Sequence, residues 1–117
     1  SYHNNPILLK SGDRNSASLI IKGKAKKQTQ IKEYYSNLNT LKPIVKDAFN
    51  YLNDKYDLVI AEGAGSPVEL NLMEKDLSNI YVASELKTKI ILVADIEKGG
   101  VFASIYGVYN LLPSSLQ

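Results

Sequence analysis

Two continuous apolar runs stand out in the hydrophobic pattern of the chain, and both reach a carboxylate at their end. Residues 57–61 lead directly to Glu62, and residues 89–95 end in Asp95. Unbroken apolar runs of this length are typical of strands buried on both faces of a parallel sheet. A helix with Asp76 as its N-cap is predicted between the two runs. Together these elements favour a strand-helix-strand unit with parallel strands and a right-handed crossover.

Two further strands and two further helices are predicted outside this unit. The apolar residues 6–10 and 17–21 predict strands, and the lysine-rich residues 22–27 predict a solvated turn. Apolar side chains recur with a helical period over residues 41–52, and Pro113 ends a last predicted helix. We therefore expect an α/β fold with a mostly parallel sheet flanked by helices.

Composition and charge narrow the range of functions only slightly. The chain has 117 residues, of which 44% are hydrophobic, which suits one domain with its own core. Neither the net charge of +2 nor the length of any apolar run indicates nucleic acid or a membrane as a partner. Cysteine is absent, which excludes thiolate chemistry within these residues and is compatible with a cytoplasmic setting. Because the first residue is Ser1, we expect a piece of a longer protein, with His3 in a loose terminus.

The two predicted strand ends carry the candidate chemistry. As neighbours in a parallel sheet, Glu62 and Asp95 would lie at the same carboxyl edge, where α/β proteins bind ligands. Magnesium usually takes one or two carboxylates and completes its coordination with water and nucleotide oxygens. Four glycines beside the acids would let backbone N–H groups approach phosphate: Gly63, Gly65, Gly99 and Gly100. The alternative is that these glycines form tight turns and that the acids are solvated strand ends.

A phosphate-binding loop of the G-x-x-x-x-G-K-[ST] type is absent from these residues. The Gly-Lys pair of the chain is Gly23-Lys24. The pattern would require glycine in place of Ser18 and a hydroxyl residue in place of Ala25. The lysine-rich stretch is therefore interpreted as a solvated turn.

Three blocks of sequence, in order and correctly spaced, resemble the cobyric acid synthase family. They are Glu62-Gly-Ala-Gly-Ser-Pro-Val-Glu-Leu-Asn-Leu72, Asp76-Leu-Ser-Asn79 and Leu92-Val-Ala-Asp-Ile-Glu-Lys-Gly-Gly-Val-Phe-Ala103. The resemblance extends back to residues 5–10 and forward to Leu112, so it covers nearly the whole chain. The chain departs from the family pattern at Ser11, where proline is expected, and at Glu97-Lys98, where aspartate and arginine are expected. Lysine cannot form the bidentate contact that arginine makes with phosphate.

The resemblance implies a glutamine-dependent amidotransferase with two parts. One part resembles dethiobiotin synthetase, which has a phosphate-loop NTPase fold. With ATP and Mg²⁺ it activates peripheral carboxylates of adenosylcobyrinic acid a,c-diamide, a corrinoid, in cobalamin biosynthesis. The other part is a glutaminase domain that supplies ammonia. Residues 1–117 would be the middle of the ATP-dependent part, with a partial version of its fold, the phosphate loop upstream and the glutaminase downstream. The isolated chain would be inactive, and the full-length protein is compatible with a homo-oligomer.

The resemblance also implies roles for individual residues. Glu62 matches the magnesium-binding glutamate of the related synthetase motif, and Asp95 is implied as a second catalytic carboxylate. Contacts to the corrinoid substrate or the nucleotide are implied for Lys10, Asp13, Ser66, Glu69 and Asn71. The four glycines named above would approach the nucleotide.

Two rival interpretations stay open at this point. The first is another dethiobiotin-synthetase-like ligase that activates a different carboxylate. The second is a non-catalytic module, related in fold to partitioning ATPases, that uses its sheet for protein association.

Overall fold

A computed structural model describes residues 1–11, 16–30, 34, 36, 38–69, 75–97 and 99–117 of the chain. The chain divides into two compact units, Ser1–Ile60 and Ala61–Gln117. Strands and helices both occur, as the predicted α/β class requires. Among the described residues, no helix is long and apolar enough to cross a membrane.

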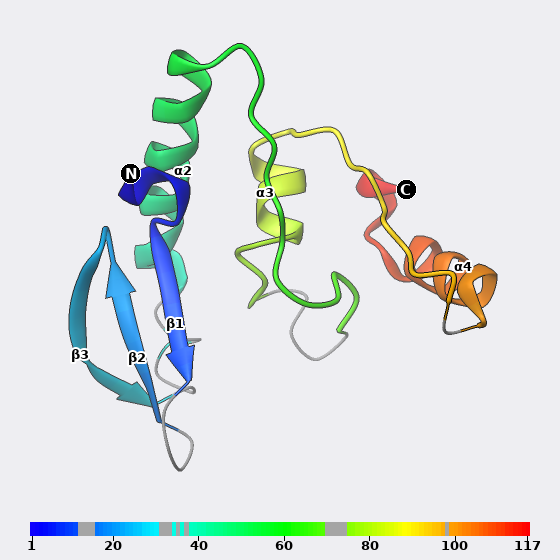
Figure 1. Cartoon of the computed structure of the whole chain (residues 1–117), viewed down its shortest axis with the longest axis horizontal. Coiled ribbons are helices and arrows are strands. Elements are labelled where there is room, and N and C mark those ends of the chain that lie inside the picture. The colour runs from blue at the N-terminus through cyan, green and yellow to red at the C-terminus, as the bar shows by residue number, and fades with distance from the viewer. Residues whose placement is uncertain (12–15, 31–33, 35, 37, 70–74, 98) are drawn as a thin grey trace. The chain divides into compact units, whose positions relative to one another are not determined.

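The first unit contains a three-stranded antiparallel sheet with the strand order β1-β2-β3 (Figure 1). Strand β1 covers Ile7–Ser11, β2 covers Ser16–Ile21 and β3 covers Lys24–Gln30. Leu9 of β1 lies opposite Leu19 of β2. The strands predicted at residues 6–10 and 17–21 are therefore confirmed, whereas β3 was not predicted.

A two-residue turn, Lys22-Gly23, connects β2 to β3. Both residues have a positive φ, 50° and 75°, which is the pattern of the tight turn that joins antiparallel strands. The Lys22 backbone N–H also donates to the Pro6 carbonyl at 2.8 Å. The predicted turn over residues 22–27 is thus wrong beyond Gly23. The exposed Lys24 and Lys26 belong to an edge strand, where lysine discourages pairing with other chains.

The helix α2, Leu38–Lys55, covers this sheet and confirms the predicted amphipathic helix. It contacts β1 and the short helix η1, Tyr2–Asn4, at the amino terminus. The buried side chains come from both the sheet and the helix: Ala17, Leu38, Leu41 and Ala48. The core of this unit therefore lies between α2 and the sheet.

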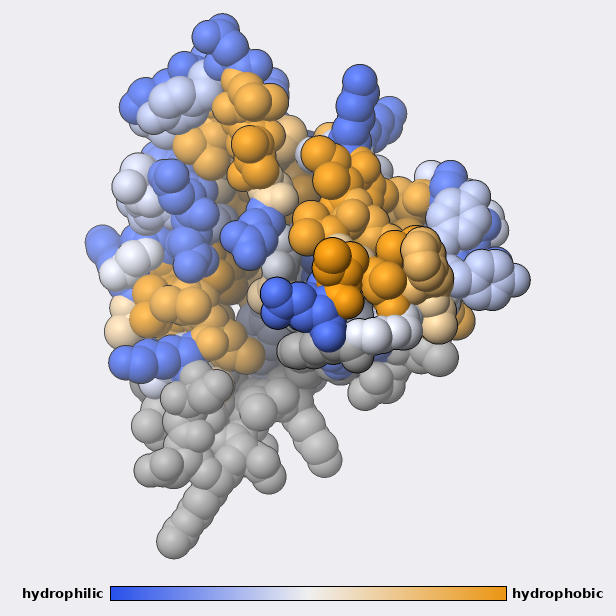
Figure 2. All heavy atoms as spheres, turned by 45° about the vertical axis from the view of Figure 1, so that its right-hand side comes forward, coloured by the Kyte–Doolittle hydropathy of each residue, from blue (hydrophilic) through white to orange (hydrophobic). Residues whose placement is uncertain are grey.

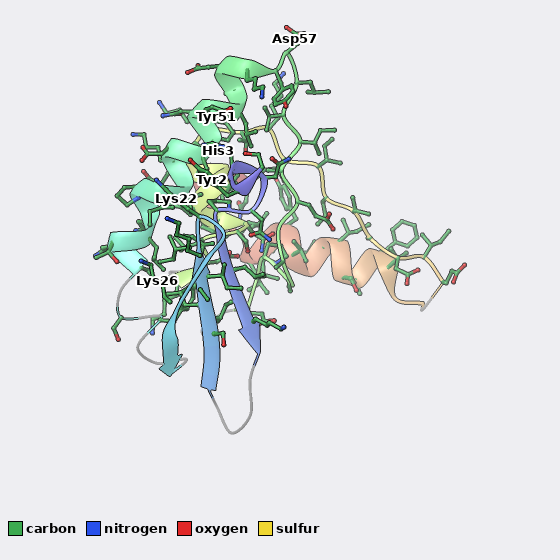
Figure 3. The ribbon with its side chains drawn as sticks, turned by 60° about the vertical axis from the view of Figure 1, so that its left-hand side comes forward. Tyr2, His3, Lys22, Lys26, Tyr51 and Asp57 are labelled. Carbon is green, nitrogen blue, oxygen red and sulfur yellow. The ribbon has the colours of Figure 1, made fainter. Side chains whose placement is uncertain are left out.

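The amino terminus is ordered against α2, contrary to the loose terminus expected for His3. Helix η1 covers Tyr2–Asn4, and its His3 ring stacks on the Tyr51 ring of α2 with centroids 3.7 Å apart (Figure 3). The Tyr2 ring lies 4.1 Å from the same imidazole, and the Ser1 hydroxyl lies 2.8 Å from its Nδ1. These contacts attach the first residues to the helix.

The second unit is helical wherever it has regular structure among its described residues. It contains α3 at Ile80–Glu85, α4 at Val101–Leu111 and the short helix η3 at Ser114–Leu116. Helices were predicted at the places of α3 and α4, and Pro113 follows α4 as expected. Within this unit α3 and η3 are in contact.

The predicted parallel sheet is wrong. Residues 57–61 and 89–95 have no regular secondary structure and belong to no strand in the described chain, and the one sheet among the described residues is antiparallel. Ile60, Ile91 and Val93 are 84%, 87% and 86% exposed, and apolar side chains gather on the surface in Figure 2. An apolar run indicates that burial is favoured, but it does not specify which strand lies beside it. No described segment pairs with either of these two runs.

Two glycines should respond in opposite directions to replacement by alanine. Gly23 has a φ of 75°, so Gly23→Ala is strained and should lower the free energy of unfolding by about 1 kcal/mol. Gly107 lies inside α4 with open space around it, so Gly107→Ala should raise helix stability by up to about 1 kcal/mol. Urea unfolding followed by circular dichroism measures both changes. A stabilising effect of Gly23→Ala would contradict the turn geometry, and a destabilising effect of Gly107→Ala would contradict the open helical position.

The exposed apolar run at residues 89–95 should make the chain self-associate. Backbone that is paired with no strand and carries exposed apolar side chains associates readily with other chains, so we expect oligomers at about 10–100 μM. Val93→Lys should shift the chain toward the monomer in sedimentation velocity. Ser104→Lys is the matched control, because it adds the same charge at an exposed polar position. A chain that is monomeric without substitution would contradict this prediction.

Candidate functional site

The loop that follows Glu62 is attached to a turn 14 to 15 residues further along the chain. The Ala64 backbone N–H donates to the Ser78 hydroxyl at 3.4 Å. The Ala64 carbonyl accepts from the Asn79 side-chain amide, Nδ2, at 3.1 Å. Both polar groups of the Ala64 backbone are therefore bound by two consecutive side chains.

The Asp76 carboxylate organises this turn. Its Oδ1 accepts from the backbone N–H groups of Ser78 and Asn79, both at 2.8 Å, and from the Ser78 hydroxyl at 3.0 Å. Its Oδ2 accepts from Asn79 Nδ2 at 2.9 Å. Accepting the N–H groups two and three residues ahead is the bonding pattern of an N-cap. Asp76 was predicted as the N-cap of the helix; it caps the turn that leads into α3, while Asn79 holds the N-cap position itself.

Gly63 packs closely against Asn79. A Cβ built on Gly63 would overlap the Asn79 side chain, whereas one built on Gly65 would meet nothing within 4 Å. Gly63 does not have a positive φ, so its backbone conformation is open to residues other than glycine. It is the Asn79 side-chain amide that leaves no room for a Cβ there. Gly65, with a φ of 71°, is limited by its backbone instead.

The predicted residues near the start of the second unit are exposed. Glu62, Ser66 and Glu69 lie outside helices and strands, and the Ser66 hydroxyl accepts from the Val68 N–H at 3.4 Å. Asn71 lies outside the described residues. Glu62 therefore stands at the entrance of an ordered loop with its carboxylate in solvent.

The second predicted carboxylate lies at another turn of the same unit. Asp95 is exposed, and its Oδ1 accepts from the Glu97 backbone N–H at 2.9 Å. Gly99 and Gly100 follow with φ of 69° and 67°, and Gly100 is the N-cap of α4. Lys98 lies outside the described residues. The glycine pair thus precedes α4, as predicted, while contact between its N–H groups and a nucleotide stays a prediction.

The predicted sheet edge does not bring the candidate residues together. Within the described part of the chain, no interaction joins Glu62 to Asp95. The described residues also contain no group of three or more His, Cys, Asp or Glu side chains that could hold a metal ion. Lys10 belongs to β1 of the first unit and is exposed, and Asp13 lies outside the described residues.

The surroundings of Tyr81 and of Lys55 shift the pKa values of these two side chains. Burial raises the pKa of Tyr81 in α3, and the charge of Glu85 raises it further, so this phenol stays neutral at physiological pH. Electrostatic interaction with Tyr51, and then with Tyr56, raises the pKa of the exposed Lys55 ammonium group. Neither effect involves a predicted catalytic carboxylate.

Sequence reasoning missed the link from Ser78 and Asn79 to the loop. The order Asp76-x-Ser78-Asn79 is a recognisable capping pattern, and it belongs to the second block of the family resemblance. That pattern predicts local hydrogen bonds only. The contact with Ala64 depends on the tertiary structure.

The fold and the site define a small α/β protein in which a glycine-rich loop after a carboxylate is fixed by a helix-capping turn. Over its whole length the chain is similar to cobyric acid synthases. It is 62% identical over 117 residues to cobyric acid synthase of Acinetobacter baylyi, covering 100% of this chain and 25% of the relative. It is 47% identical over 115 residues to a probable cobyric acid synthase of Picrophilus torridus, covering 98% and 24%.

A probable cobyric acid synthase of Methanococcus voltae is 44% identical over 115 residues, which cover 98% of this chain and 50% of the relative. The chain is therefore homologous to a segment of cobyric acid synthases, and the resemblance inferred from its motifs is confirmed. It spans about a quarter of the length of the first curated relatives. No protein-family model and no solved structure matches it.

Removing the Asp76 carboxylate should loosen the turn before α3. Asp76→Ala deprives two backbone N–H groups of their acceptor and should destabilise the second unit by about 1 kcal/mol. Amide hydrogen exchange at Ser78 and Asn79 should accelerate. Ser66→Ala is the control, because it removes only one long hydrogen bond at an exposed loop. Unchanged exchange in Asp76→Ala would contradict the capping role.

Proposed function

We propose that this chain is part of an ATP-dependent, glutamine-dependent amidotransferase that converts peripheral carboxylates of a corrinoid into amides in cobalamin biosynthesis. The observation that carries this proposal is the 62% identity to a cobyric acid synthase over the entire chain. We assign the chain to the ATP-dependent, dethiobiotin-synthetase-like part of that enzyme, with a phosphate-loop NTPase fold completed by other parts of the protein. A cytoplasmic location and ammonia from a glutaminase domain belong to the same proposal.

The proposed reaction requires activation because a carboxylate is a poor acceptor for ammonia. A carboxylate oxygen of the substrate attacks the γ-phosphorus of ATP, and the bond to ADP breaks. Ammonia then attacks the acyl carbon, phosphate leaves with the bonding electron pair, and the nitrogen loses a proton. Such transfer depends on positioning and on neutralising the phosphate charge.

Glu62 is the residue that we assign to Mg²⁺, with Asp95 as a second carboxylate. Magnesium favours carboxylate oxygens and keeps coordination positions for water and phosphate. The exposed Glu62 carboxylate fits this requirement, and the ordered loop behind it supports a fixed position. When bound, the ion would neutralise charge on the transferred phosphoryl group.

The other predicted residues keep their proposed roles at this site. We assign contacts with the corrinoid or the nucleotide to the polar residues Lys10, Asp13, Ser66, Glu69 and Asn71. We assign the approach of backbone N–H groups to the nucleotide to Gly63, Gly65, Gly99 and Gly100. The exposure of Ser66 and Glu69 supports this assignment, because both side chains are accessible to a ligand.

Replacing Glu62 by glutamine should abolish most activity of the full-length enzyme that contains this chain. Glu62→Gln keeps the shape of the side chain but removes its charge, so we expect kcat for amide formation to fall about 100-fold or more. The assay follows ADP and amide formation from cobyrinic diamide, ATP and glutamine. Glu85→Gln, at an exposed position in α3, is the matched control.

Two outcomes would overturn the proposal in different directions. Full activity of Glu62→Gln would favour the non-catalytic module. Turnover of diaminopelargonic acid in place of the corrinoid would favour the dethiobiotin-synthetase-like ligase.

A further inference from the structure

We propose that Asn79 is a positioning residue that holds the loop behind Glu62 in its working position. This inference rests on the proposed role of Glu62. Asn79 itself is expected to touch neither substrate nor nucleotide. It acts through the backbone of Ala64, which lies two residues after the carboxylate.

The Asn79 side chain connects two structures that are otherwise distant in sequence. Its Nδ2 group donates to the Ala64 carbonyl at 3.1 Å and to Asp76 Oδ2 at 2.9 Å. Its own backbone N–H donates to Asp76 Oδ1 at 2.8 Å. Asn79 is thus fixed at its backbone and at its amide, which leaves it little freedom to follow movements of the loop.

The bond to the loop is separate from the capping of α3. Asp76 supplies the acceptors for the turn through the backbone N–H groups of Ser78 and Asn79, and these bonds do not need the Asn79 side chain. The bond to Ala64 does need a side-chain donor at this position. Aspartate there would lose the donor and place a second negative charge beside Asp76, which is unfavourable.

The close packing of Gly63 against Asn79 couples the effects of substitutions at these two positions. A Cβ on Gly63 would collide with the Asn79 side chain, and the Gly63 backbone is not left-handed. The loss of kcat caused by Gly63→Ala should therefore depend on whether residue 79 carries the asparagine side chain. The cost of Gly65→Ala should not, because it comes from a φ of 71° with open space around it.

The kinetic test is a double-mutant cycle in the full-length enzyme. Asn79→Ala and Gly63→Ala should each lower kcat for amidation about 10-fold, with little change in KM for ATP or corrinoid. In the Asn79→Ala background, adding Gly63→Ala should lower kcat further by less than about 3-fold, because the Asn79 side chain that a Cβ on Gly63 would meet is no longer there. Gly65→Ala is the matched control and should cost the same in both backgrounds. Equal costs of Gly63→Ala in both backgrounds, or an unchanged kcat in Asn79→Ala, would overturn the proposal.

A second test uses the 117-residue chain and does not depend on activity. In Asn79→Ala the Ala64 carbonyl loses its donor, so the loop should separate from the turn more often. The Ala64 amide proton, which donates to the Ser78 hydroxyl, should then exchange about 10-fold faster, while the Ser78 amide, still held by Asp76, should not change. Unchanged exchange at Ala64 would overturn the proposal whatever the kinetics show. Failure of the proposed function is distinguishable, since Glu62→Gln would then retain activity even where the exchange at Ala64 responds to Asn79→Ala.

Discussion

The candidate site depends on one carboxylate, Asp76, which binds donors with both of its oxygen atoms. Two backbone N–H groups, a hydroxyl and a side-chain amide converge on it at 2.8 to 3.0 Å. Hydrogen bonds to an ionised acceptor are stronger than bonds between neutral groups. The turn at residues 76–79 is therefore held by four hydrogen bonds to one charged acceptor, and Ser78 and Asn79 connect it to the loop behind Glu62.

Individual helices and strands of this chain were predicted from the sequence better than the way in which they pair with one another. The helix Leu38–Lys55 was predicted because its apolar side chains repeat with the helical period, and α4 was predicted from its apolar residues between a glycine pair and Pro113. Strand β3 was missed because its residues are mostly polar, with lysines where alternating apolar side chains would signal a strand. The Lys22-Gly23 turn, rather than hydrophobicity, explains why β3 pairs with β2.

The prediction of a parallel sheet was wrong for a different reason. Apolar runs such as residues 89–95 show that burial is favoured, but pairing is a relation between two segments and has no signature in either one alone. The same limit applies to the candidate site. Glu62 and the capping role of Asp76 follow from local sequence, whereas the bond between Asn79 and Ala64 joins residues 15 positions apart. The roles assigned to Glu62 and Asp95 come from the position of both acids after apolar runs and from the family resemblance.

The stacking of His3 on Tyr51 provides a built-in spectroscopic reporter. His3 is the one histidine of the chain, so its imidazole C–H resonances are identifiable in an NMR spectrum without any isotope scheme. With the Tyr51 ring stacked at 3.7 Å, the ring current of that tyrosine should move these resonances upfield. Their position then reports whether the first residues are seated on α2, and a tag fused to Ser1 that lifts them away would be visible in a one-dimensional spectrum.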